Sequence, residues 1–296
     1  QQKVFEEHRK LIEQIADYRS ILDSPARVLQ IIREELLDIR RKFGDARRTQ
    51  ILPDATDDFA PTELVSNDPM VVTLSRQGYI KRLATDEFKR QGRGGRGVTG
   101  ANAKDGDFIE HLFVASMHDY ILCFTNTGRV YWLRVMDIQE GSRQSRGRSI
   151  ANYLEMREGE EIASVIPVDE FDDRDVVFAT RKGIVKRTAL SEFSRPLRGG
   201  INAIGLKEGD RLIAVAIAKA DQDILIGTRN GRAARFCGSK VRSMGRTAAG
   251  VRGIRLRGDD SVVGMVVLGA KNSLLTVCEN GYGKRTDLAE YPCKGR

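Results

Sequence analysis

A unit of about fifty residues recurs along most of this chain, and the repeat limits the folds that it can adopt. Five segments share an apolar run, a turn glycine and a second short strand that ends in basic residues. They are VVTLSRQGYIKRL (71–83), LCFTNTGRVYWLR (122–134), VFATRKGIVKRTAL (177–190), LIGTRNGRAARF (225–236) and LTVCENGYGKRTDL (275–288). Their glycines, Gly78, Gly128, Gly183, Gly231 and Gly281, follow one another at steps of 50, 55, 48 and 50 residues. Because glycine takes the positive φ of a hairpin turn without a Cβ clash, each segment predicts a β-hairpin.

A second glycine series runs in step with the first. Its motifs are Asp105-Gly106-Asp107, Glu158-Gly159-Glu160, Glu208-Gly209-Asp210 and Arg257-Gly258-Asp259, and each precedes an apolar strand. Two interleaved series with one period indicate a single β unit used several times. Blades of about four short strands around an axis suit this period, because radial closure protects the sheet edges, whereas a β-solenoid repeats at shorter intervals. We therefore predict a mainly β, propeller-like fold.

Two amphipathic helices are predicted before the repeats. Apolar residues recur at three- and four-residue steps from Val4 to Leu22 and from Val28 to Phe43. Helices this short need a partner, so residues 1–48 are interpreted as a segment of a helical arm or coiled coil. Residues 49–69 contain three prolines and five acids without periodicity, which predicts an acidic linker. The β domain then extends over residues 70–296.

The charge of the chain is unevenly placed. The whole chain has 49 Lys+Arg against 41 Asp+Glu, for a net charge of +8. Residues 1–75 hold 11 and 14 of these, which leaves 38 and 27 for the basic β region. A basic body behind an acidic tether indicates a polyanionic partner, although a merely soluble basic domain would show the same balance. No apolar run is long enough to predict a membrane span, and the N-terminus lacks an apolar signal core.

Each repeat also carries a second loop rich in arginine and glycine. The loops are QGRGGRG (91–97), RQSRGRS (143–149), RPLRGGI (195–201) and GRTAAGVRGI (245–254). The first fits the letters G-x-G-x-x-G of dinucleotide-binding loops, but no buried strand precedes it and no helical period follows. Repetition at equivalent positions favours an electrostatic rim instead.

The basic residues of the hairpins and loops are candidate contacts to DNA phosphates, and the period places them along one edge of the disc. The hairpin candidates are Lys81, Arg82, Arg134, Lys186, Arg187, Arg232, Arg235, Lys284 and Arg285, and the loop candidates are Arg93, Arg96, Arg146, Arg148, Arg198, Arg246 and Arg252. Glycine between arginines would let backbone N–H groups approach phosphates closely. Such contacts position duplex DNA and favour bending without reading bases. Paired basic residues that only solubilise strand ends are the alternative.

We find no sequence signature of catalysis. The three histidines and four cysteines are scattered, and no H-x-x-x-H, G-x-S-x-G or C-x-x-C spacing occurs. The sequence therefore predicts no catalytic residue, metal site or cofactor within this chain. Aromatic residues make up 6% of it, too few for base stacking along a single strand, so duplex DNA is the preferred partner.

The first loop carries the most specific resemblance. Gln91-Gly92-Arg93-Gly94-Gly95-Arg96-Gly97 resembles the gyrase A box, usually Q-R-R-G-G-K-G, of the C-terminal domain of bacterial DNA gyrase A subunits. Gly92 stands where the box has arginine, and Arg96 where it has lysine. ENGYGKRT (279–286) also resembles this domain, and residues 32–51 resemble the last helix of the coiled-coil arm before it.

The resemblance implies a β-pinwheel whose blades exchange strands and whose rim wraps duplex DNA in a positive sense. Gln91 to Gly97 would secure the wrapped duplex. The wrap would serve ATP-driven negative supercoiling by a type II topoisomerase of two A and two B subunits in the bacterial cytoplasm, at the nucleoid. ATP and Mg²⁺ would bind the B subunit, and the catalytic tyrosine would lie in the rest of the A subunit. Since the family has six blades, the five hairpins predict a β domain truncated at its C-terminal end.

Two other functions remain open. The related C-terminal domain of topoisomerase IV shares the blades but lacks an intact box, and it would bind DNA without strong wrapping. A propeller-like scaffold of the WD-repeat type would bind proteins through its disc face, although the W-D signature is missing. Binding that weakens steeply with salt would favour a DNA rim over the scaffold.

Overall fold

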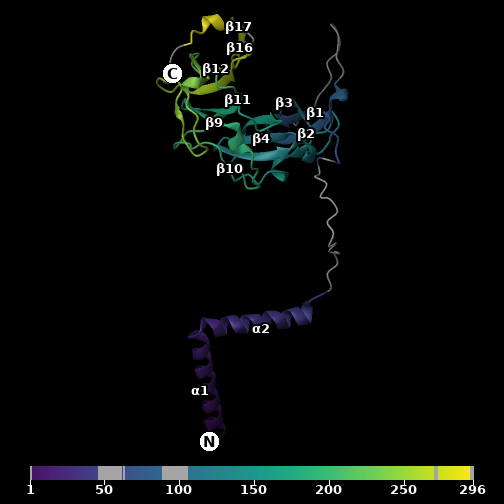
Figure 1. The fold of residues 1–296 in the computed structure, drawn as a ribbon, viewed down its shortest axis with the longest axis vertical. Coiled ribbons are helices and arrows are strands. Elements are labelled where there is room, and N and C mark those ends of the chain that lie inside the picture. The colour runs from purple at the N-terminus through teal and green to yellow at the C-terminus, as the bar shows by residue number, and fades with distance from the viewer. Residues whose placement is uncertain (1, 46–61, 63, 89–105, 270–272, 294–296) are drawn as a thin grey trace. The chain divides into compact units, whose positions relative to one another are not determined.

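The structure is a computed structural model that describes residues 2–45, 62, 64–88, 106–269 and 273–293 (Figure 1). The chain divides into two compact units, residues 1–58 and 59–296. Most of the predicted linker and the whole first loop, 91–97, lie outside the described residues. None of the described helices combines the length and the apolar character that crossing a membrane requires.

The first unit holds both predicted helices, α1 (Gln2–Leu22) and α2 (Pro25–Phe43) (Figure 1). Proline occupies the first turn of α2, where its missing N–H leaves no bond unmade. Arg27 pairs with Asp17 at 2.6 Å and so links the two helices. Their apolar stripes face solvent, with Ile15 50% and Leu36 59% exposed. Each helix therefore presents an apolar face that the described residues do not cover.

Five antiparallel hairpins in the described part of the second unit lie at the five predicted segments. They are β1 (Pro69–Ser75) with β2 (Tyr79–Ala84), β4 (Tyr120–Thr125) with β5 (Arg129–Arg134), β8 (Asp175–Thr180) with β9 (Ile184–Ala189), β12 (Asp223–Thr228) with β13 (Ala233–Cys237), and β16 (Ser273–Val277) with β17 (Gly283–Asp287). The predicted turn glycines have φ from 76° at Gly231 to 83° at Gly78. The hairpin prediction, including the need for glycine at each turn, is confirmed.

Further strands complete a sheet around each of the first three hairpins. A third strand from the same repeat pairs on one side, as it also does in the fourth hairpin, and a two-residue strand from the next repeat pairs on the other. The third strands are β3 (Ile109–Ser116), β7 (Ile162–Val168), β11 (Leu212–Ala218) and β15 (Val262–Val267), and the exchanged strands are β6 (Arg148–Ser149), β10 (Ile201–Asn202) and β14 (Val251–Arg252). The resulting orders are β3-β1-β2-β6, β7-β4-β5-β10 and β11-β8-β9-β14, followed by β15-β12-β13 and β16-β17. We call each hairpin, with the third strand of its own repeat where one is described, a blade, and number the blades 1 to 5. Each exchanged strand and the loop before it therefore come from the following blade.

A short 3₁₀ turn follows the second strand of every hairpin. These turns are η2 (Thr85–Glu87), η3 (Val135–Asp137), η5 (Leu190–Phe193), η6 (Gly238–Lys240) and η7 (Leu288–Glu290), and η4 (Ile150–Asn152) follows the exchanged strand β6. Each hairpin thus ends in a 3₁₀ turn directly after its second strand, and the backbone carbonyls of this turn are hydrogen-bond acceptors.

The apolar core lies between the blades rather than within one sheet. One cluster joins Val72 and Ile80 of blade 1 to Ile121 of blade 2, and equivalent clusters join blades 2 and 3 and blades 3 and 4. Neighbouring residues such as Leu122 and Cys123 belong to different clusters because successive side chains point to opposite faces of a strand. Central strands buried on both faces explain the continuous apolar runs in the sequence.

Strand order defines an inner and an outer side of the β unit. The third strands β3, β7, β11 and β15 contact one another in succession, so they form the inner side. The exchanged strands β6, β10 and β14 form the opposite edge of their sheets and lie on the outer side. The arginine-rich loops lead into these outer strands. We call residues 142–147, 195–200 and 245–250 the rim loops.

Candidate nucleic-acid interface

The rim loops and the outer strands that follow them expose most of the predicted loop arginines. Arg146, Arg148, Arg198 and Arg252 are exposed, whereas Arg246 is half-buried. The Arg146 guanidinium lies 5.2 Å from the centroid of the Tyr79 ring, which limits its freedom but leaves it accessible. Arg198 pairs with Glu155 at 3.0 Å although its side chain is 91% exposed, so this pair is too well solvated to be strong. These arginines remain available to an anion.

Three further arginines of the same loop regions were not singled out from the sequence. Arg195 and Arg242 are exposed, and the half-exposed Arg143 pairs with Glu87 at 3.2 Å. Arg143 and Arg195 stand inside the repeated loop segments, and Arg242 lies three residues before the fourth one. The loop repeat was therefore the signal that could have found them. The box residues Gln91, Gly92, Arg93, Gly94, Gly95, Arg96 and Gly97 lie outside the described residues, and their role stays a prediction.

The lysines at the hairpin ends require a correction. The sequence predicts Lys81 and Lys186 on the rim, but their exposed fractions are 1% and 0%. The Lys81 ammonium donates hydrogen bonds to the carbonyl oxygens of Ser142, Arg143 and Ser145, at 2.9, 2.9 and 2.8 Å. A lysine enclosed in this way cannot meet a phosphate, because its donors are already taken by backbone carbonyls.

Lys186 repeats this arrangement two blades further on. Its ammonium donates to the carbonyl oxygens of Ala203, at 2.7 Å, and Arg246, and it lies 5.4 Å from the centroid of the Phe178 ring. Burial and the positive charge of Arg246 lower the pKa of Lys186 to about 8. Burial likewise lowers the pKa of Lys81. Both lysines contact a rim loop of the following blade.

The hairpin arginines also join blades. At the fourth position after the turn glycine, Arg82, Arg187 and Arg235 donate to carbonyl oxygens in or directly after the 3₁₀ turn of the next blade. Their acceptors are Val135 and Met136 at 3.3 and 3.0 Å, Gly238 at 3.2 Å, and Leu288 and Tyr291 at 2.9 and 3.2 Å, respectively. In blade 2 the indole N–H of Trp132 donates to Phe193 at 2.8 Å in the same way. Because these side chains are largely enclosed, they connect blades and do not form an outer surface.

The remaining hairpin candidates are more accessible. Arg134 pairs with Asp137 in its own 3₁₀ turn at 2.9 Å, and this hydrogen bond raises the pKa of Arg134. Its side chain keeps 32% exposure. Arg232, Lys284 and Arg285 are exposed on blades 4 and 5. The structure thus separates the predicted hairpin cations into enclosed blade joints and a smaller exposed group.

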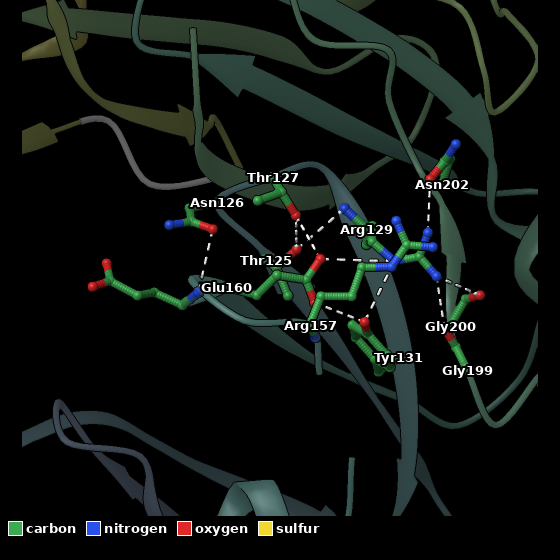
Figure 2. A network of polar contacts seen from close by, with 11 residues as sticks. Thr125, Asn126, Thr127, Arg129, Tyr131, Arg157, Glu160, Gly199, Gly200 and Asn202 are labelled. Atoms are coloured by element: carbon green, nitrogen blue, oxygen red, sulfur yellow. Dashed lines mark hydrogen bonds and ion pairs between the residues drawn. The ribbon is translucent and has the colours of Figure 1, made fainter. Parts of the chain in front are cut away.

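Blade 2 carries a polar network where the lysine is replaced by tyrosine (Figure 2). The Glu160 carboxylate accepts hydrogen bonds from the hydroxyls of Thr127 and Tyr131, both at 2.7 Å, and pairs with Arg129 at 3.7 Å. Burial raises the pKa of Glu160, but hydrogen bonds from Thr127, Tyr131 and the Arg157 amide outweigh it, so its pKa is lowered. The Arg129 guanidinium in turn donates to the carbonyl oxygens of Gly199 and Gly200, at 2.6 and 3.0 Å. Here an arginine holds the rim loop.

An acid in or directly after each motif of the second glycine series accepts a hydrogen bond from the hairpin turn of its own blade. In the fourth motif, Arg257-Gly258-Asp259, this acid is Asp260, the residue after the motif. Asp107, Asp210 and Asp260 accept hydrogen bonds from the backbone N–H groups of Gln77, Lys182 and Asn230, at 3.0, 2.9 and 3.0 Å. Glu160 reaches the same turn position through the Thr127 hydroxyl. The two glycine series run in step because each of these repeats contains one hairpin turn and one acid that accepts a hydrogen bond from it.

Three glycines of the rim loops have a packing role that the sequence analysis does not predict. Gly147, Gly200 and Gly250 have φ of 90°, 65° and 91°. A Cβ at Gly200 would lie 2.8 Å from the carbonyl oxygen of Val130, and one at Gly250 would lie 2.5 Å from that of Val185. Gly147 meets Ile80 in the same way. At Gly147, Gly200 and Gly250, therefore, the missing side chain allows close approach to the preceding blade.

The described residues contain no group of three or more histidine, cysteine, aspartate or glutamate side chains placed to hold a metal ion.

The family of the chain follows from its match to a family model described as "DNA gyrase C-terminal domain, beta-propeller". The match covers residues 69–116, 119–169, 174–219, 222–268 and 272–296, which are the five repeats. The chain belongs to this gyrase C-terminal domain family.

Curated relatives agree with the family. The DNA gyrase A subunit of Salmonella typhimurium is 45% identical over 296 residues, which is all of this chain and 34% of the relative. The DNA gyrase A subunit of Staphylococcus epidermidis is 44% identical over 298 residues, covering 99% of this chain and 33% of the relative. The chain thus spans about a third of the length of these relatives.

Solved structures of gyrase and topoisomerase IV C-terminal domains share the fold. A structure of the DNA gyrase A C-terminal domain superposes with a TM-score of 0.65 at 27% identity, covering 77% of this chain and 75% of the other. A crystal structure of the C-terminal domain of DNA topoisomerase IV gives the same TM-score and identity, covering 78% and 71%. The propeller-like fold predicted from the repeat is confirmed.

Proposed function

We propose that the outer rim of the β unit binds duplex DNA and wraps it in a positive sense. The observation that carries this proposal is the repetition of exposed arginines on the outer edge of successive blades: Arg148, Arg198 and Arg252. Duplex DNA offers regularly spaced phosphates, so a cation at each blade can be met along a curved path. Such contacts hold the backbone without reading the sequence, and several of them can offset the cost of bending, roughly 1–6 kcal/mol.

The same proposal extends to the parent protein. The relatives are gyrase A subunits, and we propose that the wrap serves ATP-dependent negative supercoiling by a type II topoisomerase in the bacterial cytoplasm. In that assembly a B subunit would supply the ATP and Mg²⁺ site, and the remaining part of the A subunit would supply the cleavage tyrosine. The β unit would contribute DNA geometry and no chemistry.

The first experiment seals a nicked circular plasmid with ligase at increasing amounts of the chain and resolves the topoisomers after removal of protein. A positive shift in linking number is the expected result. Replacing Arg148, Arg198 and Arg252 together by alanine should abolish most of the shift. The matched control replaces Arg76, Arg181 and Arg229, which are exposed and stand two residues before the turn glycines, so it removes equal charge. Equal loss in both triple variants would refute a rim-specific wrap.

Salt dependence separates the alternatives. Each phosphate contact contributes about 0.9 to the slope of log affinity against log salt, so the rim variant should lose roughly 3 from that slope. Salt-sensitive binding without a linking-number shift would favour the topoisomerase IV type of domain, whose structure is equally similar. A DNA affinity that does not change with salt concentration would favour a protein scaffold.

A further inference from the structure

We propose that a cation on each of blades 1 to 3 holds the rim loop of the next blade in the geometry that presents its arginines outward. Lys81, Arg129 and Lys186 are then positioning residues for the DNA-binding rim, and their side chains do not touch DNA. This inference rests on the proposed function of the rim as a DNA interface. It assigns three buried or half-buried cations a task that neither a phosphate contact nor ordinary core packing describes.

Lys81 of blade 1 holds the rim loop of residues 142–147 through its ammonium. A lysine ammonium has three N–H donors, and three carbonyls of the rim loop 142–147 accept from it. The loop then turns at Gly147 against Ile80, the residue just before Lys81 in β2. The exposed Arg146 and Arg148 flank this glycine. Their backbone positions are therefore set by blade 1, although they lie in the next repeat.

The junction between blades 2 and 3 reaches the same result with other side chains. Tyr131 occupies the lysine position, and Arg129 supplies the cation from two residues earlier. Its guanidinium donates hydrogen bonds to the carbonyl oxygens of Gly199 and Gly200 and, at 3.0 Å, to the side-chain oxygen of Asn202. Gly199 and Gly200 directly follow the exposed Arg198. Glu160 holds the arginine in place (Figure 2). The cation thus changes from lysine to arginine between these two junctions, but the acceptors remain carbonyl oxygens of the rim loop. We infer that holding the loop is the requirement that the junctions share.

Lys186 provides the third case at the junction between blades 3 and 4. It binds the carbonyl of Arg246 in the rim loop 245–250 and that of Ala203, which follows the exchanged strand of the preceding junction. Gly250 lies against Val185, the residue before Lys186, as Gly147 lies against Ile80. The same pair of contacts, cation to loop carbonyl and loop glycine to strand carbonyl, thus recurs at both lysine junctions.

Preordering explains why these contacts matter for binding. Each exchanged strand pairs through only two residues, which is little to hold a loop in one conformation. A loop that is ordered before DNA arrives loses less conformational entropy when its arginines engage phosphates. Loss of the internal cation should therefore loosen the loop and weaken wrapping, although no DNA contact has been removed.

The test compares Lys81→Met and Lys81→Arg with Lys240→Met in the 296-residue chain. Lys240 is exposed on blade 4, so its replacement removes the same charge without touching a rim loop. Without DNA, hydrogen exchange of amides 142–149 should become roughly tenfold faster in both Lys81 variants and stay unchanged in the control. With DNA, the linking-number shift should fall to about half or less in both Lys81 variants, since a guanidinium does not fit a site built for an ammonium.

Lys81→Arg decides between positioning and direct contact. A phosphate contact would survive this substitution, so a wild-type shift in Lys81→Arg with a loss in Lys81→Met would overturn the proposal. Unchanged exchange of residues 142–149 in both variants, or faster exchange with an unchanged shift, would overturn it too. If the Lys81 variants fail to fold, Arg129→Met decides, with exchange of residues 195–202 as the readout.

The two proposals fail in different ways. If the wild-type chain gives no linking-number shift, wrapping fails. Faster hydrogen exchange of amides 142–149 in the Lys81 variants would then still support the positioning role of Lys81. DNA affinity would replace the linking-number shift as the second readout. If the wild type shifts and the variants match it in both exchange and shift, the rim remains the DNA interface and the positioning role is wrong.

Discussion

Blades 3 and 5 carry the same three residues, Lys-Arg-Thr, in the second strand of their hairpins, yet the environments are opposite. Lys186 and Thr188 of blade 3 are fully buried, and Arg187 is largely enclosed. In blade 5, by contrast, Lys284 and Arg285 are exposed, as are Leu275 (64%) and Val277 (65%) of the pairing strand. The hairpins have the same turn and the same pairing. A neighbouring blade, and not the hairpin, therefore decides whether this motif connects two blades or faces solvent.

The largest expected difference between these blades is in their apolar residues. Phe178→Ala in blade 3 should cost about 3–5 kcal/mol of unfolding free energy, because the ring is fully buried against Phe124 and Phe193. Leu275→Ala in blade 5 should cost less than about 0.5 kcal/mol, since the side chain is mostly exposed. Urea unfolding of both variants measures the difference. Equal costs would mean that the exposure of blade 5 does not hold in solution.

The arginines should show a smaller contrast. Arg187→Met should cost about 2–3 kcal/mol, because it removes a hydrogen bond to Gly238 and leaves the buried Asp175 carboxylate without its ion pair at 3.5 Å. Arg285→Met should leave the unfolding free energy nearly unchanged and instead weaken DNA binding. Denaturant titration and a filter-binding assay separate the two effects. A stable Arg187→Met chain with lost DNA binding would contradict the assignment of Arg187 to a blade joint.

A pH series tests the burial of Lys186 by itself. Its pKa is lowered to about 8 by burial and by Arg246, from 10.5 for an unperturbed lysine. Above pH 8 the folded chain has released this proton while the unfolded chain still binds it, so the Lys186 contribution to stability rises with pH. The expected rise between pH 7 and pH 9 is about 1.4 kcal/mol. It is measured as the wild-type unfolding free energy minus that of Lys186→Met, which cancels the other groups. A flat difference would show that Lys186 is solvated.

The smallest expected contrast concerns glycines with similar backbone angles. Gly250 in the blade 3–4 junction and Gly281 in the blade 5 turn have φ of 91° and 81°. Alanine at Gly281 meets nothing within 4 Å, so it should cost about 1 kcal/mol for the left-handed backbone alone. Alanine at Gly250 would also lie 2.5 Å from the Val185 carbonyl oxygen, and we expect an excess of about 1 kcal/mol or more. Thermal unfolding of both variants checks this excess, and equal values would deny the close approach.

Much of the fold could be predicted from local patterns. The turn glycines required positive φ, the apolar runs required burial on both faces, and the period required one repeated unit; each follows from a few neighbouring residues. The two helices followed from their apolar spacing in the same way. The strand exchange was implied by the family resemblance and could not be read from Arg148 or Val251, because a two-residue strand has no pattern of its own.

The candidate site was predictable only in part, for a related reason. The exposed arginines Arg148, Arg198 and Arg252 stand in repeated loops, so their common position could be inferred from spacing. Glu160 stands in the second glycine series, but its contact with Arg129 gave no signal, because this network replaces the lysine of the other junctions with different residue types. Lys81 and Lys186 were misplaced, since a lysine next to an arginine normally predicts a solvated strand end.

The sequence by itself determined the repeat, the hairpins with their turns, and the arginine-rich loops, because these depend on local backbone preference and on the alternation of side chains along a strand. Only the tertiary structure decided which cations face solvent and which hold the next blade. The carbonyls that enclose Lys81 lie 61 to 64 residues away in the chain. Burial and hydrogen bonding at such a separation arise from the packing of one blade on another, which no local pattern records.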